Sequence, residues 1–329
     1  MKNVLLLSTG GTIASVRTEH GLSPGMSGSD LIDSLGPLQD RFRFSVKQIL
    51  NLDSSDISSA EWQMIARTVA EEYQNYDGIV ITHGTDTMAY TACALSFMLQ
   101  NISCPVVLTG SQIPMGNMLT DARNNLFCAL AAVESGIAGV SVAFNRRIIR
   151  GCRAVKVRTM GFDAFESVNA KYLGEIFADG LRVYDYQLPT DSFSFRPALS
   201  TDVFLLKLIP DTNPDLFPAL AGLGYRAIVL ETFGAGGFHS GNSRLLHEIQ
   251  AIQNEGILVA ACSQCLYEPS NLSIYEVGRK LLDTGVISAG DMTTEAAVVK
   301  LMWILGQTDS VQEAQALFRT NLAGELSES

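Results

Sequence analysis

The stretch Gly78-Ile79-Val80-Ile81-Thr82-His83-Gly84-Thr85-Asp86-Thr87 decides the fold. Its first half is a short apolar run of the kind that forms a strand, and its second half is a polar turn. Residues 87–99 then show helical periodicity. A strand that passes through a short turn into a helix is the first part of a βαβ unit, which predicts a parallel sheet.

The same alternation continues on both sides of this stretch. Ser58 and Glu61 have the spacing of a capping box before one expected helix, and Gly136 is a suitable stop for another. The expected strands are 4–8, 42–50, 78–82, 106–109 and 139–144, and the expected helices are 29–35, 59–73, 87–99 and 121–135. These elements predict right-handed crossovers in a doubly wound sheet.

Two domains are expected, because the chain has 329 residues and its periodicity is lost beyond Asp185. The later expected strands are 203–209, 227–231 and 257–262, and the later helices are 243–254, 274–283 and 293–306. We therefore expect an α/β protein with a larger N-terminal parallel-sheet domain over 1–190, which carries catalysis. A linker over 191–200 and a smaller C-terminal α/β domain over 201–329 follow.

The composition argues against several functions. Lys and Arg number 23 against 34 Asp and Glu, a net charge of −11, whereas nucleic-acid binding relies on basic side chains that neutralise phosphates. The first residues lack the pattern of a signal peptide, and no apolar run approaches the roughly 18 residues of a membrane span. We expect a cytoplasmic protein with neither nucleic acid nor a membrane as a partner.

Neither a metal nor a cofactor is expected. The cysteines lie in apolar stretches, which favours reduced, buried thiols: Cys93, Cys104, Cys128, Cys152, Cys262 and Cys265. Cys262 and Cys265 have the spacing of a metal or redox pair, but no second pair and no suitably spaced histidine accompanies them. Gly10-Gly11 matches neither glycine pattern that binds nucleotide phosphates.

The residues after each expected strand matter most, because ligands of an open parallel sheet bind beyond the carboxyl ends of its strands. Four such loops are rich in small polar residues: 9–12, 51–56, 83–87 and 110–112. Any one of them could be an ordinary turn or a helix cap. Four on one edge indicate a site, and glycine beside a hydroxyl suits oxyanion stabilisation in acyl transfer.

A threonine hydroxyl in these loops is a candidate nucleophile, and it needs a base. His83 is one possibility, although it could instead only pack or bridge backbone groups. Lys156, after the fifth expected strand, is the leading candidate, because a lysine held away from water can accept a proton as in Ser-Lys hydrolases. Spacing alone favours the simpler interpretation of Lys156 as a solvated surface lysine.

Residues 8–15 (STGGTIAS) and 81–91 (ITHGTDTMAYT) together resemble the two signatures of the bacterial L-asparaginase family. Residues 51–56, 108–112, 150–165 and 291–296 extend the resemblance over essentially the whole chain. Without an export signal, the chain is similar to the cytoplasmic type I enzymes. The resemblance implies an amidohydrolase that converts L-asparagine, and possibly L-glutamine, through an acyl-threonine intermediate. It also implies a homodimer or homotetramer.

The resemblance also implies roles for individual residues. Thr12 matches the nucleophile, and the second threonine-centred relay is formed by Thr85, Asp86 and Lys156. The residues that match the substrate-binding positions are Asp53, Ser54, Ser55, Thr85 and Asp86. Physical chemistry agrees, because an aspartate can pair with an α-ammonium while serine hydroxyls and backbone N–H groups can hold an α-carboxylate.

Two positions depart from the family pattern. Leu22 stands where many members have a tyrosine on the loop after the first strand. Glu231 stands where a basic residue would help to bind the anionic regulatory ligand of some type I enzymes, so we do not expect that regulatory site.

Two other functions remain open. Leu22 is the motive for the first, a non-catalytic amino-acid sensor of the same fold. The second is an ammonia-releasing transamidosome subunit, which the acidic charge and the early position of Thr12 disfavour.

Overall fold

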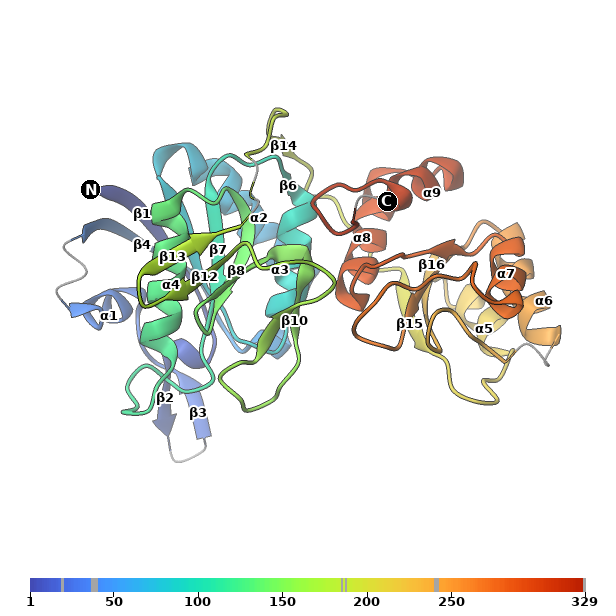
Figure 1. Cartoon of the computed structure of the whole chain (residues 1–329), viewed down its shortest axis with the longest axis horizontal. Coiled ribbons are helices and arrows are strands. Elements are labelled where there is room, and N and C mark those ends of the chain that lie inside the picture. The colour runs from blue at the N-terminus through green and yellow to red at the C-terminus, as the bar shows by residue number, and fades with distance from the viewer. Residues whose placement is uncertain (19–20, 37–40, 185, 187, 240–242, 328–329) are drawn as a thin grey trace. The chain divides into compact units, whose positions relative to one another are not determined.

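The computed structural model describes the whole chain except residues 19–20, 37–40, 185, 187, 240–242 and 328–329. Over 16–18 and 21–24 and at 243 it describes the backbone without the side chains. The chain divides into two compact units, Met1–Pro197 and Ala198–Ser329 (Figure 1). Each unit contains its own parallel sheet.

The parallel sheet of the first unit has the order β4-β1-β5-β7-β8. These strands are β1 (Lys2–Gly10), β4 (Phe42–Leu52), β5 (Gly78–Thr82), β7 (Pro105–Thr109) and β8 (Gly139–Phe144). The α/β fold expected from the sequence is confirmed. β5 is buried along its whole length, which explains why it is apolar at every position but its last.

An antiparallel extension of this sheet was not expected. β9 (Arg147–Arg150) returns against β8, and β12 (Gly174–Phe177) and β13 (Gly180–Val183) continue in the same manner. Asn145 and Arg146, with φ of 45° and 64°, form a two-residue turn between β8 and β9. Two consecutive residues with positive φ are typical of a tight β-hairpin turn. The chain therefore forms an antiparallel hairpin here and not the helical crossover of a parallel sheet.

Helices pack on the sheet of the first unit (Figure 1). α1 (Gly28–Asp33) and α4 (Ala122–Ser135) share a core with Val4 and Leu6 of β1. Leu5 and Leu7 alternate with these residues and are also buried, so the strand is covered on both faces. α2 (Ser59–Glu72) and α3 (Met88–Met98) pack against each other, and α3 also packs on β8.

The predicted ends of two helices are confirmed. Ser58 and Glu61 form a reciprocal capping box at the start of α2. Gly136 ends α4 in the left-handed conformation, with φ of 74°. These local signals therefore mark where α2 begins and where α4 ends.

Short strand pairs add detail to the first unit. They are β2 (Ser15–Thr18) with β3 (Gly21–Pro24), β6 (Leu99–Gln100) with β14 (Ser194–Phe195), and β10 (Ala154–Lys156) with β11 (Phe165–Ser167). The β10–β11 pair matters most for function, because it contains Lys156.

The second unit contains the parallel sheet β15-β16-β17-β18. Its strands are β15 (Val203–Lys207), β16 (Ala227–Thr232), β17 (Leu258–Ser263) and β18 (Ile287–Ser288). Its helices are α5 (Leu216–Gly222), α6 (Ser243–Asn254), α7 (Glu276–Asp283), α8 (Thr294–Gln307) and α9 (Val311–Arg319). Lys300 of α8 and Glu325 form an ion pair with both side chains fully buried, 2.6 Å apart.

The cysteine thiols are all free, and five of them are buried as expected. Cys265 is exposed, so the expectation of a buried thiol was wrong there. It follows the end of β17, where the chain has left the sheet and enters a loop. In the part of the chain that the structure describes, no three His, Cys, Asp or Glu side chains gather to hold a metal ion.

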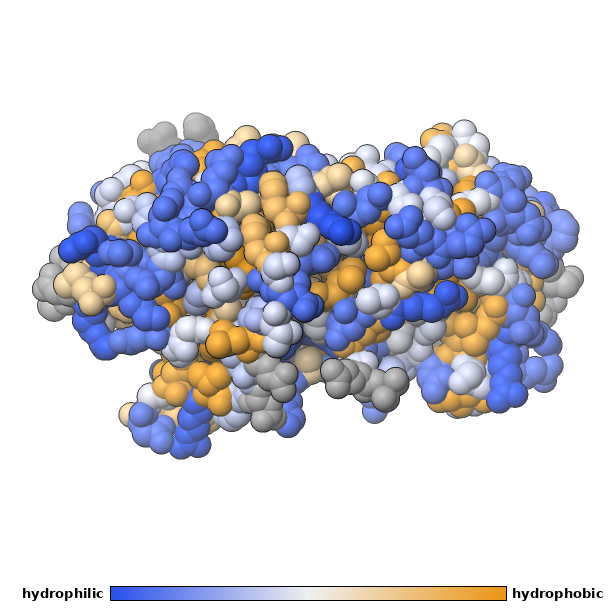
Figure 2. Space-filling model, turned by 90° about the horizontal axis from the view of Figure 1, so that it is seen from above, coloured by the Kyte–Doolittle hydropathy of each residue, from blue (hydrophilic) through white to orange (hydrophobic). Residues whose placement is uncertain are grey.

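The surface is mixed in character. Hydrophilic residues predominate on the face seen in Figure 2, with hydrophobic patches between them. Exposed apolar side chains of the first unit include Met118, Leu119, Met160 and Phe162. Among the described residues, no helix has the length and apolar character needed to cross a membrane.

Candidate active site

The loops after β1, β4, β5 and β7 follow neighbouring parallel strands at one edge of the sheet, which we call the first edge (residues 9–12, 51–56, 83–87 and 110–112). Gly11 has φ of 79°, and a Cβ atom there would lie 2.3 Å from the backbone nitrogen of Gly84. A Cβ on Gly84 would lie 2.6 Å from Ser54 Oγ. Only glycine permits such close approach, so these residues let three loops touch.

Thr12 and Thr85 lie on loops that touch, because Thr12 follows Gly11 and Thr85 follows Gly84. Thr12 begins a short 3-10 helix, Thr12–Ala14, and is half-buried. The Gly11 carbonyl accepts from the Ser15 hydroxyl at 3.0 Å and from the Ala14 backbone N–H. These two hydrogen bonds therefore stabilise the turn that carries Thr12.

Thr85, Asp86 and Lys156 form a connected group. Lys156 Nζ lies 2.8 Å from Thr85 Oγ1 and 2.5 Å from Asp86 Oδ1. The Lys156 side chain is only 16% exposed, whereas that of Asp86 is 66% exposed. The interpretation of Lys156 as a solvated surface lysine is therefore wrong, since it lies against a nearly buried threonine hydroxyl.

Lys156 reaches Thr85 through pairing that is remote in sequence. It ends β10, opposite Phe165 of β11, and Val157 continues the ladder by donating to the Ala164 carbonyl. β10 also packs against α3, the helix that follows the Thr85 loop. The lysine is thus fixed by a strand and not carried on a free loop.

Three of the five residues predicted to bind the substrate, those on the loop after β4, differ in their surroundings. Asp53 accepts from the Ser55 backbone N–H at 2.9 Å and from the Ser55 hydroxyl at 2.6 Å, and these hydrogen bonds lower the pKa of the Asp53 carboxyl. Both residues are exposed. Ser54 is buried, and its hydroxyl accepts from the Asp86 backbone N–H. Ser54 therefore braces the Asp86 loop.

His83 is excluded as the base. It is fully buried, and burial lowers its pKa to about 4. Nδ1 lies 2.7 Å from the Gly84 carbonyl, which can only accept, so Nδ1 carries the proton. Nε2 then accepts from the Thr91 hydroxyl at 2.9 Å. Both ring nitrogens are used within the fold, which supports the packing role.

Gln112 joins the group, although sequence reasoning assigned it no role. Its side-chain oxygen accepts from Thr85 Oγ1 at 3.3 Å. The only sequence signal was its position on the first edge, two residues after Gly110. A glutamine in a polar loop is too common to be singled out on that ground.

Leu22 belongs to β3, where its backbone pairs with Arg17. Its side chain lies outside the described residues, so the expectation that Leu22 occupies the position of the family's loop tyrosine stays a prediction.

A cavity of about 200 Å³ adjoins the relay and is lined by Asp86, Lys156, Val157, Arg158 and Thr159. It offers space next to the two charged groups of the relay.

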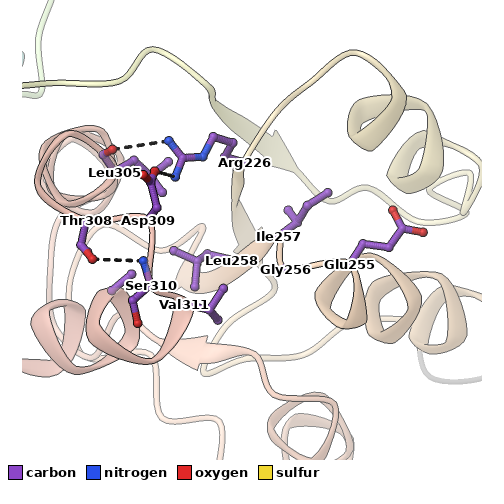
Figure 3. Close-up of a pocket in the computed structure, with 11 residues that line it drawn as sticks. Arg226, Glu255, Gly256, Ile257, Leu258, Leu305, Thr308, Asp309, Ser310 and Val311 are labelled. Carbon is purple, nitrogen blue, oxygen red and sulfur yellow. Dashed lines mark hydrogen bonds and ion pairs between the residues drawn. The ribbon is translucent and has the colours of Figure 1, made fainter.

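A second cavity, of about 280 Å³, lies in the second unit (Figure 3). Arg226 there donates to the Leu305 carbonyl and to Asp309, and Thr308 accepts from the Ser310 backbone N–H. The guanidinium of Arg226 and the side chains of Thr308 and Asp309 are therefore already hydrogen-bonded within this unit. We place the candidate active site at the first edge.

Comparison with known protein families covers almost the whole chain. Residues 3–188 match the asparaginase N-terminal domain, and residues 202–318 match the glutaminase/asparaginase C-terminal domain.

Individual relatives agree with this match. An L-asparaginase from Thermococcus kodakarensis is 41% identical over 98% of both chains, and the solved structure of the thermostable L-asparaginase from that organism superposes with a TM-score of 0.94 over 99% of this chain and all of that one. L-asparaginase I from Vibrio cholerae is 33% identical over 99% of both chains, with a TM-score of 0.90. A glutamyl-tRNA(Gln) amidotransferase subunit from Methanosphaera stadtmanae is 36% identical over 99% of this chain and 77% of its own length. With both domains matched and these identities over nearly its full length, the chain belongs to the asparaginase family.

Proposed function

We propose that this chain is an L-asparaginase that hydrolyses the side-chain amide of L-asparagine to L-aspartate and ammonia. The observation that carries the proposal is the contact of Lys156 with Thr85 and Asp86, on loops whose backbones touch the Thr12 loop. A threonine nucleophile needs a proton acceptor, and this lysine is a basic group at the first edge that is both shielded and in contact with a hydroxyl. Family membership supports the same chemistry.

In the first half of the reaction, Thr12 Oγ attacks the amide carbon while its proton passes through Thr85 to Lys156. The lysine returns that proton through Thr85 to the amide nitrogen, so the C–N bond breaks and ammonia departs. In the second half, water attacks the acyl-Thr12 ester. The water's proton passes by the same relay to the Thr12 oxygen, and aspartate is released.

The amino-acid end of the substrate has partners on the same edge. Asp86 keeps most of its carboxylate exposed while one oxygen contacts Lys156, so it can take up an α-ammonium. Asp53, Ser54 and Ser55 belong to the adjoining loop, and we assign them to this end of the substrate. L-glutamine differs by one methylene, which is worth only about 1–3 kcal/mol of discrimination, so we expect it to be a weaker substrate.

We also propose a homodimer or homotetramer in the cytoplasm. Met118, Leu119, Met160 and Phe162 are between 45% and 94% exposed, and a second copy would cover such side chains. The free thiols support a reducing compartment. Light scattering that showed only a fully active species of 35.5 kDa would overturn the oligomer.

One experiment tests the activity directly. Purified protein should release ammonia from L-asparagine, and Lys156→Met should lose nearly all of this activity. Lys47→Met is the matched control, because Lys47 is 47% exposed in a surface ion pair. Leu22→Gly should lose less than Lys156→Met, since Leu22 has no proton-transfer role.

Other outcomes would support the other functions. Tight calorimetric binding of asparagine with no ammonia over hours would make the chain a sensor. Ammonia released only in the presence of a tRNA-dependent partner would favour the role named for the amidotransferase relative, which is the second candidate that the 36% identity supports.

A further inference from the structure

Gln112 presents its amide in one orientation only. Its Nε2 lies 3.1 Å from the Thr159 carbonyl and 3.0 Å from the Gly161 carbonyl, and both of these oxygens can only accept. The amide nitrogen therefore faces the two carbonyls, and Oε1 faces Thr85. A reversed amide would set oxygen against oxygen at both contacts.

The backbone of Gln112 is anchored just as firmly. Its N–H lies 3.0 and 3.1 Å from the two carboxylate oxygens of Asp121, and the next N–H, that of Ile113, lies 3.0 Å from Oδ1. Asp121 is 8% exposed and also accepts from Asn125 Nδ2, which in turn donates to the Gly110 carbonyl. A buried carboxylate thus sets the position of the Gln112 side chain.

Thr85 has a single hydroxyl proton, and among the described residues two neighbours could receive it, Lys156 Nζ and Gln112 Oε1. When Lys156 is an ammonium in the enzyme without substrate, it can only donate, so the Thr85 proton goes to Gln112 Oε1. When Lys156 is a neutral amine, its nitrogen can accept the proton over the shorter contact, 2.8 Å against 3.3 Å. Gln112 therefore satisfies the Thr85 hydroxyl in one protonation state of the lysine and not in the other.

We propose that Gln112 is a positioning residue of the relay: it receives the Thr85 proton while Lys156 is charged, and thereby sets the pH at which the relay becomes active. The proposal rests on the proposed function, in which the neutral lysine accepts the proton. Without Gln112 Oε1, the charged state would leave a nearly buried hydroxyl proton without an acceptor. That state would lose stability, and activity would begin at lower pH.

Other charged groups around Lys156 stay unchanged in such a test. Asp86 contacts it directly, and Arg158 lines the same cavity while paired with Asp163 and Glu166, the latter on β11. The elements packed against β10 add further ionisable side chains: Tyr90 and Cys93 on α3 and the buried Arg153. Gln112 itself is neutral, so its replacement by methionine changes a hydrogen bond and no charge.

The test compares Gln112→Met, which removes the acceptor at similar volume, with Gln112→Glu, which keeps an acceptor and adds negative charge. The acid limb of the kcat/KM profile should move down by about 0.5–1 pH unit in the first variant, as expected for losing one ordinary hydrogen bond in one protonation state. It should move up in the second. If both limbs coincide with that of the wild type, the proposal is wrong, whatever happens to kcat.

A second measurement does not need turnover. The ¹³Cε signal of Lys156, assigned by its loss in Lys156→Met, should show the same opposite displacements of its titration midpoint in the two variants. If the wild type releases no ammonia, the proposed function fails while this titration still tests Gln112. An unmoved midpoint in both variants would overturn the role of Gln112 even in an active enzyme.

Discussion

Both parallel sheets carry polar side chains where their strands end, and they use them differently. At the first edge, glycines bring the loop backbones together, and Thr85, Asp86 and Lys156 meet beside a cavity. At the edge of the second sheet, which we call the second edge (residues 207–208, 231–234 and 262–265), side chains bond to the backbone or to each other. Gln264 Nε2, for instance, donates to the carbonyls of Leu208 and Glu231.

Glu231 shows the difference most clearly. Its carboxylate accepts from the Thr294 hydroxyl at 2.9 Å and lies 3.4 Å from Lys207 Nζ, so its charge is already compensated. The two edges share one feature, a threonine near the end of a strand whose hydroxyl donates to the neighbouring strand. Thr9 donates to the Thr82 carbonyl and Thr232 to the Cys262 carbonyl, both at 2.8 Å. Both sheets therefore have an edge at which a site could form. The close glycine contacts are found at the first edge, where the reactive groups lie together.

The largest effect should come from removing a hydroxyl at the first edge. Thr12→Ala and Thr85→Ala should each lower kcat by about 100-fold or more, because each removes a reacting or relaying hydroxyl. Thr232→Ala, which removes a threonine hydroxyl from the second edge, should keep kcat within about threefold. Ammonia release and thermal unfolding, measured on all three variants, check this. If either first-edge variant kept a near-normal kcat at unchanged stability, that threonine would be neither the nucleophile nor the relay.

The second unit should respond in stability instead. Lys300 Nζ contacts Glu325 and the carbonyls of Phe318 and Thr320, all inside the unit. Glu325→Gln would leave a buried ammonium without its counter-ion and should cost about 3–5 kcal/mol of unfolding free energy. Denaturant unfolding measures this cost, and the kcat of the folded fraction should not change.

A surface pair of the same unit provides the control. Lys280 and Glu276 are spaced i,i+4 on α7 and exposed, so Lys280→Met should cost about 0.5 kcal/mol or less. Equal costs in the Glu325 and Lys280 variants would show that the buried pair has no special role.

The free energy of unfolding should depend on pH through His83, a residue of the first edge. The folded pKa of His83 is about 4, below its ordinary value of 6.5, so the unfolded chain binds the extra proton first. The stability that this neutral histidine contributes is fully present above pH 6.5. It is lost as pH falls toward 4, by up to about 3 kcal/mol. The unfolding free energy of His83→Gln, measured over the same range, should fall less steeply; parallel curves would contradict the assignment.

A single added methyl group tests the close contacts of the glycines at the first edge. Gly84→Ala would place Cβ 2.6 Å from Ser54 Oγ and should cost about 1–3 kcal/mol, together with a loss of kcat as the loops separate. Gly222→Ala in α5 meets nothing within 4 Å and should stabilise the chain by up to about 1 kcal/mol. If the two variants behave alike, close packing of the loops is not what builds the first edge.

Local signals explain why much of this fold is predictable from sequence. β5 is an uninterrupted apolar run, and Ser58 and Gly136 act on the backbone within a few residues. The hairpin at Asn145 and Arg146 escapes such reasoning, because its two residues carry little turn signal beyond a single asparagine.

The candidate site could likewise be predicted from the sequence only in part. Its loops follow the strands and so could be located, whereas the shielding of Lys156 and the contact of Gln112 depend on partners 71 and 27 residues away. Contacts over such distances leave no periodicity in the sequence. The exposure of Cys265 likewise depends on where the chain leaves β17.

The turn back at β9 has a consequence for the order of folding. Lys156 meets Thr85 only after the chain has reversed at β9 and β10 has packed against α3. Because non-local strand pairing forms more slowly than local helices, secondary structure should return before the relay does. During refolding, the far-ultraviolet circular dichroism should therefore recover earlier than ammonia release, with an interval in which the protein is compact and inactive.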